Sequence, residues 1–397
     1  MNLGVYIQVP FCQTKCTYCN FHTGVVAREK YHPYAAAVCR EISALASSSE
    51  LAPLRGATID SVYFGGGTPS LLEPAALANI LNLLRTSFGL APHVGQHVPM
   101  VPEVTLEADP ETITAEKAAA WCAAGFNRIS LGVQSFDDRE LQAAGRMHRS
   151  ADISAAAKVL RAVGFRNISM DLIAGLAHQT RESWEGSVAR ILAVRPEHIS
   201  IYMLEIDGGS RLGSESLAGG SRYSAREIPS DDAMAEFYDA ACMRLASAGY
   251  EHYEISNWGL PEFRSRHNLK YWRREPYIGF GAGAHSFDGA RRWSNVHDSA
   301  RYVTCIEQGM SPREQIESVT PEAALEEALF LGLRQLEGID LAQIERKYEV
   351  SLRERIAPLQ RDGFVELDGT RLRLASDRLT VSNEVFVELL GQGVERA

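Results

Sequence analysis

The sequence has few cysteines, no long hydrophobic run and no excess of basic residues. Its 397 residues include only seven cysteines, an odd number. The sequence shows no signal-peptide pattern. These features argue against a secreted scaffold held by disulfides and favour a reducing compartment, so we expect a cytoplasmic protein. No apolar run is long enough to cross a bilayer, which leaves only peripheral contact with a membrane.

Acidic residues outnumber basic ones, with 50 Asp and Glu against 40 Lys and Arg. The formal net charge of −10 argues against a nucleic-acid partner, because such proteins usually carry a basic face. The length exceeds the usual size of one hydrophobic core. We therefore expect one large domain and a smaller one.

Three of the cysteines lie in one short segment. Cys12, Cys16 and Cys19 form C-x3-C-x2-C directly after a short apolar strand. Thiolates suit iron–sulfur clusters or zinc. Clusters are commonly held by four cysteines, so three would leave one iron open to a small molecule.

Two other interpretations of this segment stay open at this point. His22 could complete a Cys3His zinc site of purely structural role, and a disulfide is the second alternative. The spacing differs from the C-x2-C pairs of zinc sites and favours the cluster. The other four cysteines stand alone in predicted helices, where we expect buried, small apolar residues: Cys39, Cys122, Cys242 and Cys305.

Up to about residue 206, short apolar strands alternate with amphipathic helices. The predicted strands are Val5–Val9, Ser61–Phe64, Val104–Glu107, Arg128–Val133, Ile168–Ile173 and His198–Leu204. The predicted helices are Tyr34–Ala46, Pro74–Ser87, Ala115–Ala124, Ala151–Val163 and Glu182–Ala193. This α/β pattern predicts a parallel sheet with helices on its outer face, an incomplete (β/α)6 TIM-like barrel. Its chemistry would lie at the carboxyl ends of the strands.

The remaining segments complete the predicted organisation. Gly89–Pro102 and Asp207–Ser230 resemble loops, and Asp231–Ala248 is a predicted helix. Three short helices and a hairpin across Asp368-Gly369 predict a small winged-helix-like α+β module, a lid or docking domain with mixed charges. The expected helices are Glu322–Gln335, Leu341–Lys347 and Ser351–Asp362, and the strands Phe364–Leu367 and Arg371–Ala375. We place the domain bounds at 1–230, 231–310 (a barrel extension) and 311–397.

Glycines and polar residues mark the expected strand ends. Gly65-Gly66-Gly67-Thr68-Pro69 follows a strand, where glycines let the backbone approach a ligand closely, or simply form a tight turn. Polar residues recur at or beyond later strand ends: Glu107, Gln134, Arg146 and Asp171. Each could bind a ligand at the barrel mouth or only cap the next helix.

Together these motifs resemble the radical S-adenosylmethionine (SAM) proteins of the oxygen-independent coproporphyrinogen III oxidase family, from Tyr6 to about Phe287. The resemblance implies that Cys12, Cys16 and Cys19 bind a [4Fe–4S] cluster whose open iron takes SAM. It implies SAM contacts from Tyr6, Gly66, Gly67, Thr68 and Glu107, and a second SAM site or equivalent cavity lined by Gln134, Arg146 and Asp171. Reduction of the cluster would split SAM into methionine and a 5′-deoxyadenosyl radical.

Two features distinguish the branches of that family. The oxidases carry a fourth cysteine two residues after the third, where this chain has Phe21, and an N-terminal extension that is not found here. His267-Asn-Leu-Lys-Tyr-Trp272 is similar to the H-N-x-x-Y-W signature of the HemW-type haem chaperones. The resemblance therefore favours a chaperone that carries cluster and SAM and delivers haem to haem-requiring proteins.

The alternatives are an enzyme of the oxidase type, which converts propionates to vinyl groups, and another radical reaction on a tetrapyrrole. His267 could ligate haem iron, with Tyr271 and Trp272 stacking on the macrocycle. From the residues alone, a hydrogen-bonded histidine in a packed loop is the competing interpretation. His285 is a second histidine near the expected cavity, without an assigned role.

Overall fold

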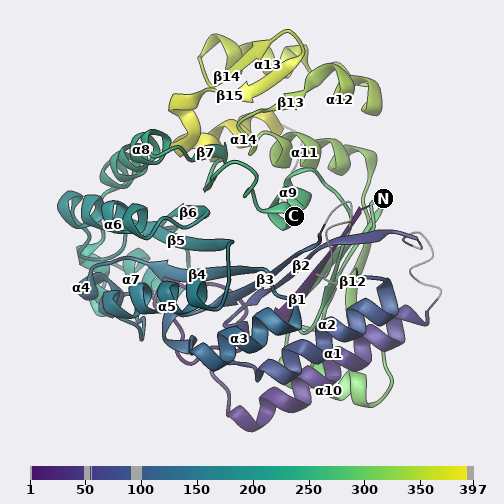
Figure 1. The fold of residues 1–397 in the computed structure, drawn as a ribbon. Coiled ribbons are helices and arrows are strands. Elements are labelled where there is room, and N and C mark those ends of the chain that lie inside the picture. Colours follow the sequence, from purple (N-terminus) through teal and green to yellow (C-terminus); the bar gives the residue numbers. More distant parts are fainter. Residues whose placement is uncertain (1, 49–53, 55, 91–100, 391–397) are drawn as a thin grey trace.

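The computed structural model describes residues 2–48, 54, 56–90 and 101–390. Six parallel strands lie side by side in chain order and form the predicted incomplete barrel (Figure 1). They are β1 (Asn2–Val9), β2 (Thr58–Gly66), β3 (Glu103–Ala108), β4 (Arg128–Gln134), β5 (Ile168–Ala174) and β6 (His198–Met203). The alternation of short apolar strands and amphipathic helices therefore predicted the fold class correctly.

Helices cover the outer face of these strands. They are α1 (Tyr31–Ala46), α2 (Pro74–Phe88), α3 (Ala115–Ala124), α4 (Asp138–Ala143), α5 (Ser150–Ala162) and α6 (Arg181–Val194). Trp121 of α3 and Trp184 of α6 are fully buried against the sheet, as expected for the apolar stripe of a core-facing helix. The carboxyl ends of all six strands meet at one rim, which places the segments that follow them close together.

The sheet continues beyond the six predicted strands on both edges. Beside β1 lie β9 (Tyr277–Phe280), β10 (His285–Phe287), β11 (Arg291–Asn295) and β12 (Arg313–Ser318). Beside β6 lie β8 (Asn257–Gly259) and β7 (Glu251–Glu254). Helices α8 (Asp231–Ser247), α9 (Arg266–Trp272) and α10 (Ser299–Glu307) connect these strands. Most of these strands are too short to produce a clear period-two pattern in the sequence.

Two expectations about individual segments are corrected. Asp207–Ser230 is not a plain loop: it contains α7 (Arg211–Leu217) and a 3-10 segment (Arg222–Glu227), because Ser210 caps the helix and Leu212 is buried. The predicted loop Gly89–Pro102 lies mostly outside the described residues. Of the four isolated cysteines only Cys305 is buried; Cys39 and Cys242 are half-buried, and Cys122 is exposed on the outer face of α3.

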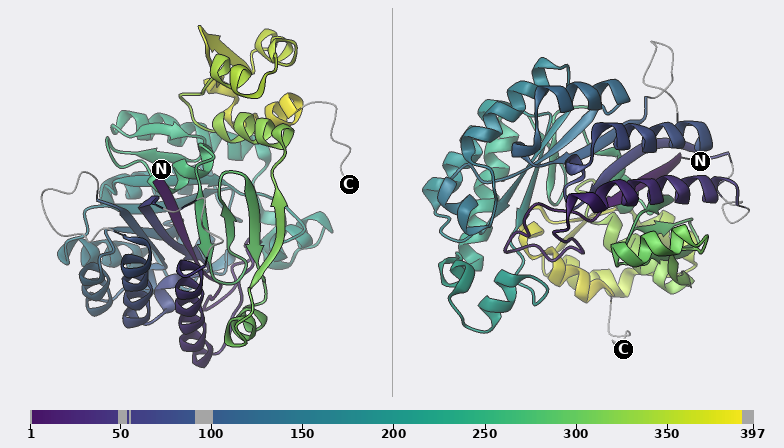
Figure 2. Two further views of the ribbon diagram at one scale, coloured as in Figure 1. Left: turned by 90° about the vertical axis from the view of Figure 1, so that its right-hand side faces the viewer. Right: turned by 90° about the horizontal axis from the view of Figure 1, so that it is seen from below.

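The C-terminal module has the predicted winged-helix arrangement. It contains α11 (Pro321–Gly332), β13 (Ile339–Asp340), α12 (Leu341–Tyr348), α13 (Arg353–Arg361), β14 (Val365–Asp368), β15 (Arg371–Leu374) and α14 (Ser382–Leu390). The predicted β14–β15 hairpin forms, but its two-residue turn is Gly369-Thr370, one position later than expected, because Asp368 still pairs with Arg371. Strand β13 adds a third strand to this sheet. Figure 2 (left) shows this yellow-green module at one end of the molecule.

The module contacts α9 and β7 at the end of the barrel where the strands begin. Arg274 pairs with Glu327 at 2.7 Å, and the N–H of Leu336 donates to the carbonyl of Tyr253. It therefore does not cover the carboxyl ends of the strands in this structure. Among the helices that the structure describes, none is long and apolar enough to span a bilayer.

Candidate functional site at the carboxyl ends of the strands

A cavity of about 420 Å³ opens at the carboxyl ends of the barrel strands. This volume is large enough for a small organic ligand. Ten of the residues singled out in the sequence line it together: Cys12, Cys16, Cys19, Gly66, Gly67, Thr68, Glu107, Gln134, Arg146 and Asp171. They come from six different segments of the chain, which the parallel order of the strands brings to one rim.

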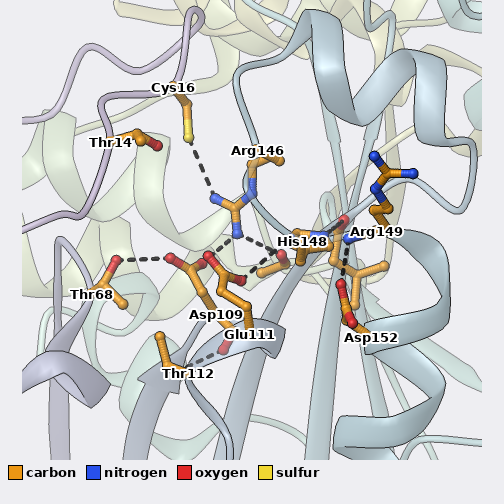
Figure 3. A network of polar contacts seen from close by, with 12 residues as sticks. Thr14, Cys16, Thr68, Asp109, Glu111, Thr112, Arg146, His148, Arg149 and Asp152 are labelled. Carbon is orange, nitrogen blue, oxygen red and sulfur yellow. Dashed lines mark hydrogen bonds and ion pairs between the residues drawn. The ribbon is translucent and has the colours of Figure 1, made fainter.

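The cysteine loop follows β1 and is contacted by Arg146, which follows α4. Its guanidinium lies 3.5 Å from Sγ of Cys16 and also pairs with the carboxylate of Asp109 (Figure 3). The hydroxyl of Thr68 donates to the same carboxylate at 2.9 Å. Arg146 and Asp109 therefore connect the cysteine loop, the glycine segment and the segment after β3.

The thiol chemistry of the loop fits an iron–sulfur cluster. Burial is the main cause that raises the pKa of Cys12 to about 11, so without a cation this thiol keeps its proton. Bound iron would deprotonate it outright, as metal ions do with coordinating thiols. In the side-chain orientations of the described residues, no three His, Cys, Asp or Glu groups are arranged to hold a metal ion. Cluster binding would therefore involve rotation of the cysteine side chains.

The zinc alternative requires His22 beside the cysteines. Its ring instead packs on that of His297, with the ring centroids 4.5 Å apart, and His22 does not line the cavity. The seven cysteines are all free thiols, so the disulfide alternative gains no support either. The placement of these residues thus favours the three-thiolate interpretation over a Cys3His site.

The glycine segment packs against the cysteine loop as well as lining the cavity. The N–H of Gly67 donates to the carbonyl of Val9, and that of Thr68 donates to the carbonyl of Phe11. A Cβ on Gly67 would fall 2.5 Å from the carbonyl oxygen of Phe11, which only glycine avoids. Gly66 has a φ of +107°, a conformation that also favours glycine. Gly67 thus allows the close approach of two backbones, whereas Gly65 and Gly66 leave room for neighbouring side chains, those of Tyr6, Tyr63, Glu107 and Gln8.

Two half-buried carboxylates face the cavity, those of Glu107 and Asp171. Glu107 accepts from the hydroxyl of Tyr63 at 2.8 Å and from the N–H of Gly66 at 3.2 Å, yet burial raises its pKa to about 7. Burial likewise raises the pKa of Asp171 to about 6. Carboxyl groups with raised pKa values in a cavity are typical of functional sites. A cationic ligand in the cavity would favour their charged forms.

Tyr6 and His267 lie below the cavity, inside the barrel. The rings of Tyr6 and Tyr63 are stacked with centroids 6.0 Å apart, and His267 stacks on Tyr63 at 5.2 Å. Neither Tyr6 nor His267 lines the cavity, but both contact the tyrosine that hydrogen-bonds Glu107.

His267 belongs to the floor of the barrel. Its Nδ1 lies 3.0 Å from the hydroxyl of Ser61, and its Nε2 lies 2.9 Å from that of Tyr271. Burial lowers its pKa to about 3. Both ring nitrogens are therefore engaged within the protein, as in the packed-loop interpretation, and haem ligation by His267 stays a prediction. The neighbouring Trp272 is covered by the guanidinium of Arg334.

The sequence analysis missed three residues of this site. Asp109 lies two positions after Glu107, and its side chain is the central partner of Arg146. The spacing Glu-x-Asp after an apolar strand was the available signal. Tyr63 and Tyr202 are inward-facing strand tyrosines, and nothing in the sequence distinguishes them from core aromatics.

Comparison with known proteins agrees with this geometry. Residues 6–191 match the model of the radical SAM superfamily, and residues 319–376 match that of the HemN C-terminal domain. A protein of Bacillus subtilis named heme chaperone HemW is 31% identical, over 98% of this chain and 99% of its own length. Its namesake in Mycobacterium tuberculosis is 35% identical, over 98% of this chain and 95% of its own length.

The fold also matches a solved structure. Coproporphyrinogen III oxidase (HemN) from Escherichia coli superposes with a TM-score of 0.80 at 22% identity, over 98% of this chain and 89% of its own. At that identity the match concerns the fold alone. The end-to-end similarity at 31% and 35%, together with the two matching family models, means that this chain belongs to the HemW family of radical SAM proteins.

Proposed function

We propose that this protein binds haem and delivers it to haem-requiring proteins in the cytoplasm, with a [4Fe–4S] cluster and SAM at the cavity. The observation that carries the proposal is the similarity to proteins named heme chaperone HemW, which extends over 98% of this chain. It includes the cysteine loop, the cavity and the α9 segment.

In this proposal Cys12, Cys16 and Cys19 hold the cluster, with the Arg146 guanidinium beside the Cys16 sulfur to offset the thiolate charge. Gly66, Gly67, Thr68 and Glu107 provide the adjoining surface for SAM. The cluster, once bound and reduced, would supply the electron that cleaves SAM. Gln134 and Asp171 line the same cavity and provide polar contacts for a second ligand molecule.

Exposed apolar side chains at the mouth of the cavity support the proposal of an apolar cargo. Phe21 is 66% exposed, Met147 55% and Tyr202 44%, and all three line the cavity. Exposed apolar surface of this kind marks a binding site for a partner or an apolar ligand. Phe21 occupies the position at which the oxidases carry their fourth cysteine, which supports the chaperone over the enzyme.

The C-terminal module is proposed as a docking surface for the recipient protein. Of the predicted divisions 1–230, 231–310 and 311–397, we move the last boundary to the start of α11 at Pro321, because β12 (Arg313–Ser318) pairs with β11 in the main sheet. The module's contacts with α9 leave the cavity uncovered, so a lid role has no support in this structure.

The test uses anaerobically reconstituted protein with intact cluster. Ferric haem is titrated in and the Soret band is followed; in parallel, coproporphyrinogen III is offered with SAM and a reductant. We expect tight haem binding, haem transfer to an apo-haemoprotein and no protoporphyrinogen. Absence of haem binding would overturn the proposal, and efficient propionate decarboxylation would make the protein an oxidase instead.

A further inference from the structure

Three histidines from distant parts of the sequence form a surface cluster beside the cysteine loop. The ring of His297 contacts that of His22 at 4.5 Å and that of His285 at 6.4 Å between centroids. All three residues are exposed. His22 lies three residues after Cys19, His285 begins β10, and His297 follows β11. We call these three residues the histidine cluster.

The imidazole nitrogens of the histidine cluster differ from those of the interior histidines. His148, His178, His198, His252 and His267 each hydrogen-bond a neighbouring group. Within the described part of the chain, the rings of His22 and His285 each contact the ring of His297, and none of the three makes a hydrogen bond. A ring nitrogen without a protein partner is available to a metal ion.

Hydrogen bonds fix the backbone segments that carry His285 and His297. The N–H of Gly283 donates to the carbonyl of Val296, and the N–H of Asn295 donates to that of Ala284, which pairs the backbones next to His285 and His297. Buried Glu41 locks the same region: its carboxylate accepts from the Gly281 N–H at 2.9 Å and from Asn295 Nδ2 at 2.7 Å. A buried carboxylate with hydrogen bonds to two segments fixes their relative position.

A glycine makes room for the central ring. Gly283 has a φ of +72°, and a Cβ there would come within 3.1 Å of Nδ1 of His297. Phe21 and Val25 are neighbours of His22 along the loop and are 66% and 60% exposed. An aromatic ring and an aliphatic side chain beside free imidazoles match a flat apolar ligand that carries a metal ion.

We propose that the histidine cluster is a haem-binding site, with His297 as an axial ligand of the iron and Phe21 in contact with the macrocycle. This inference rests on the proposed function and names a site for its cargo. A porphyrin supplies the equatorial ligands itself, so one or two imidazoles suffice to hold the iron. This explains how the histidine cluster can bind haem although the described residues hold no ready site for a bare metal ion. The position next to the cysteine loop would also place the cargo beside the mouth of the cavity, which Phe21 lines.

The test titrates ferric haem into the cluster-containing protein and into His297→Ala, His22→Ala, His285→Ala and the control His32→Ala. His32 is exposed on α1 and belongs to no ring contact described above. We expect His297→Ala to weaken haem binding at least tenfold and to change the Soret band, with partial recovery of the spectrum on addition of free imidazole. His32→Ala should bind as the wild type does.

The outcomes separate this site from the function itself. If the wild-type protein with intact cluster binds no haem, the proposed function fails, and this site fails with it. If the wild type binds haem but all three variants of the histidine cluster keep its affinity and spectrum, only this site is wrong. Loss of the Soret band in His267→Ala alone, in a variant that still folds, would place the iron at α9 instead.

Discussion

The hydroxyl of Tyr63 donates a hydrogen bond to Oε1 of Glu107 at 2.8 Å, and this bond connects the floor of the barrel to the cavity. Below it, the Tyr63 ring stacks on His267, which is itself fixed by Ser61 and Tyr271. Above it, Glu107 lines the cavity. The α9 segment that distinguishes this family branch is therefore linked by direct contacts to a residue expected to bind SAM.

Tyr63→Phe removes that hydrogen bond and leaves the ring in place. Loss of one such bond costs about 1 kcal/mol, so we expect SAM affinity to fall roughly fivefold. Calorimetry on the anaerobic, reconstituted protein measures it. Tyr250→Phe is the control, because it loses a buried hydrogen bond to the carbonyl of Pro196, and neither residue lines the cavity. Equal SAM affinity in both variants would exclude a role for the Tyr63–Glu107 bond.

Glu107 makes the stability of the ligand-free protein depend on pH. Its pKa is raised to about 7 in the folded state from an ordinary 4.5, so the folded state binds the proton more tightly. The stabilisation is complete below about pH 4.5 and is lost as the pH rises through 7. Between these limits, the wild type should lose about 3 kcal/mol of unfolding free energy relative to Glu107→Gln.

Urea unfolding at a series of pH values measures this difference, with the exposed Glu116→Gln as a control for loss of one carboxyl group. A constant difference between wild type and Glu107→Gln from pH 4.5 to pH 8 would show that Glu107 is not shifted in the folded state.

Gly67→Ala should disturb the packing of the glycine segment on the cysteine loop. The added Cβ meets the backbone carbonyl of Phe11, which cannot rotate away, so we expect a loss of about 1–3 kcal/mol in the free energy of unfolding. The reconstituted variant should also contain less iron. Gly24→Ala, in the same loop but with no atom within 4 Å of the new Cβ, should match the wild type in both measurements.

The three cysteines of the loop should account for all bound iron. Replacement of Cys12, Cys16 and Cys19 by alanine should abolish both iron and acid-labile sulfide after anaerobic reconstitution. The matched control replaces Cys39, Cys122 and Cys242, which lie on helices outside the cavity, and should keep both. Zinc without sulfide in the wild-type protein would contradict the cluster.

His267→Ala should destabilise the floor of the barrel. It removes a buried ring and leaves the hydroxyls of Ser61 and Tyr271 without their partner, which together costs about 2–5 kcal/mol. Exposed His297→Ala should change the free energy of unfolding by no more than about 0.5 kcal/mol. Denaturant titration compares them. Similar stability of the two variants would mean that α9 does not hold the barrel floor.

The sequence alone determined the barrel, the cysteine loop and most of the cavity. Short apolar strands and amphipathic helices have distinct periods, and in a parallel barrel every strand ends at the same rim. Inward-facing residues in the carboxyl halves of neighbouring strands, such as Glu107 in β3 and Asp171 in β5, therefore line the same cavity. The C-terminal hairpin was also predictable from Asp368-Gly369, although the turn itself falls one residue later, at Gly369-Thr370.

Only the tertiary structure decided which side chains face each other. The ion pair of Arg146 with Asp109, the placement of His267 under Tyr63 and the contact of His22 with His297 join residues that lie far apart along the chain or on different elements. The residue types and their local spacing do not predict these contacts. A histidine that becomes buried cannot be told from an exposed one by its neighbours in the sequence. The helix α7 within an expected loop and the exposed Cys122 were decided in the same way, by packing that the local pattern does not encode.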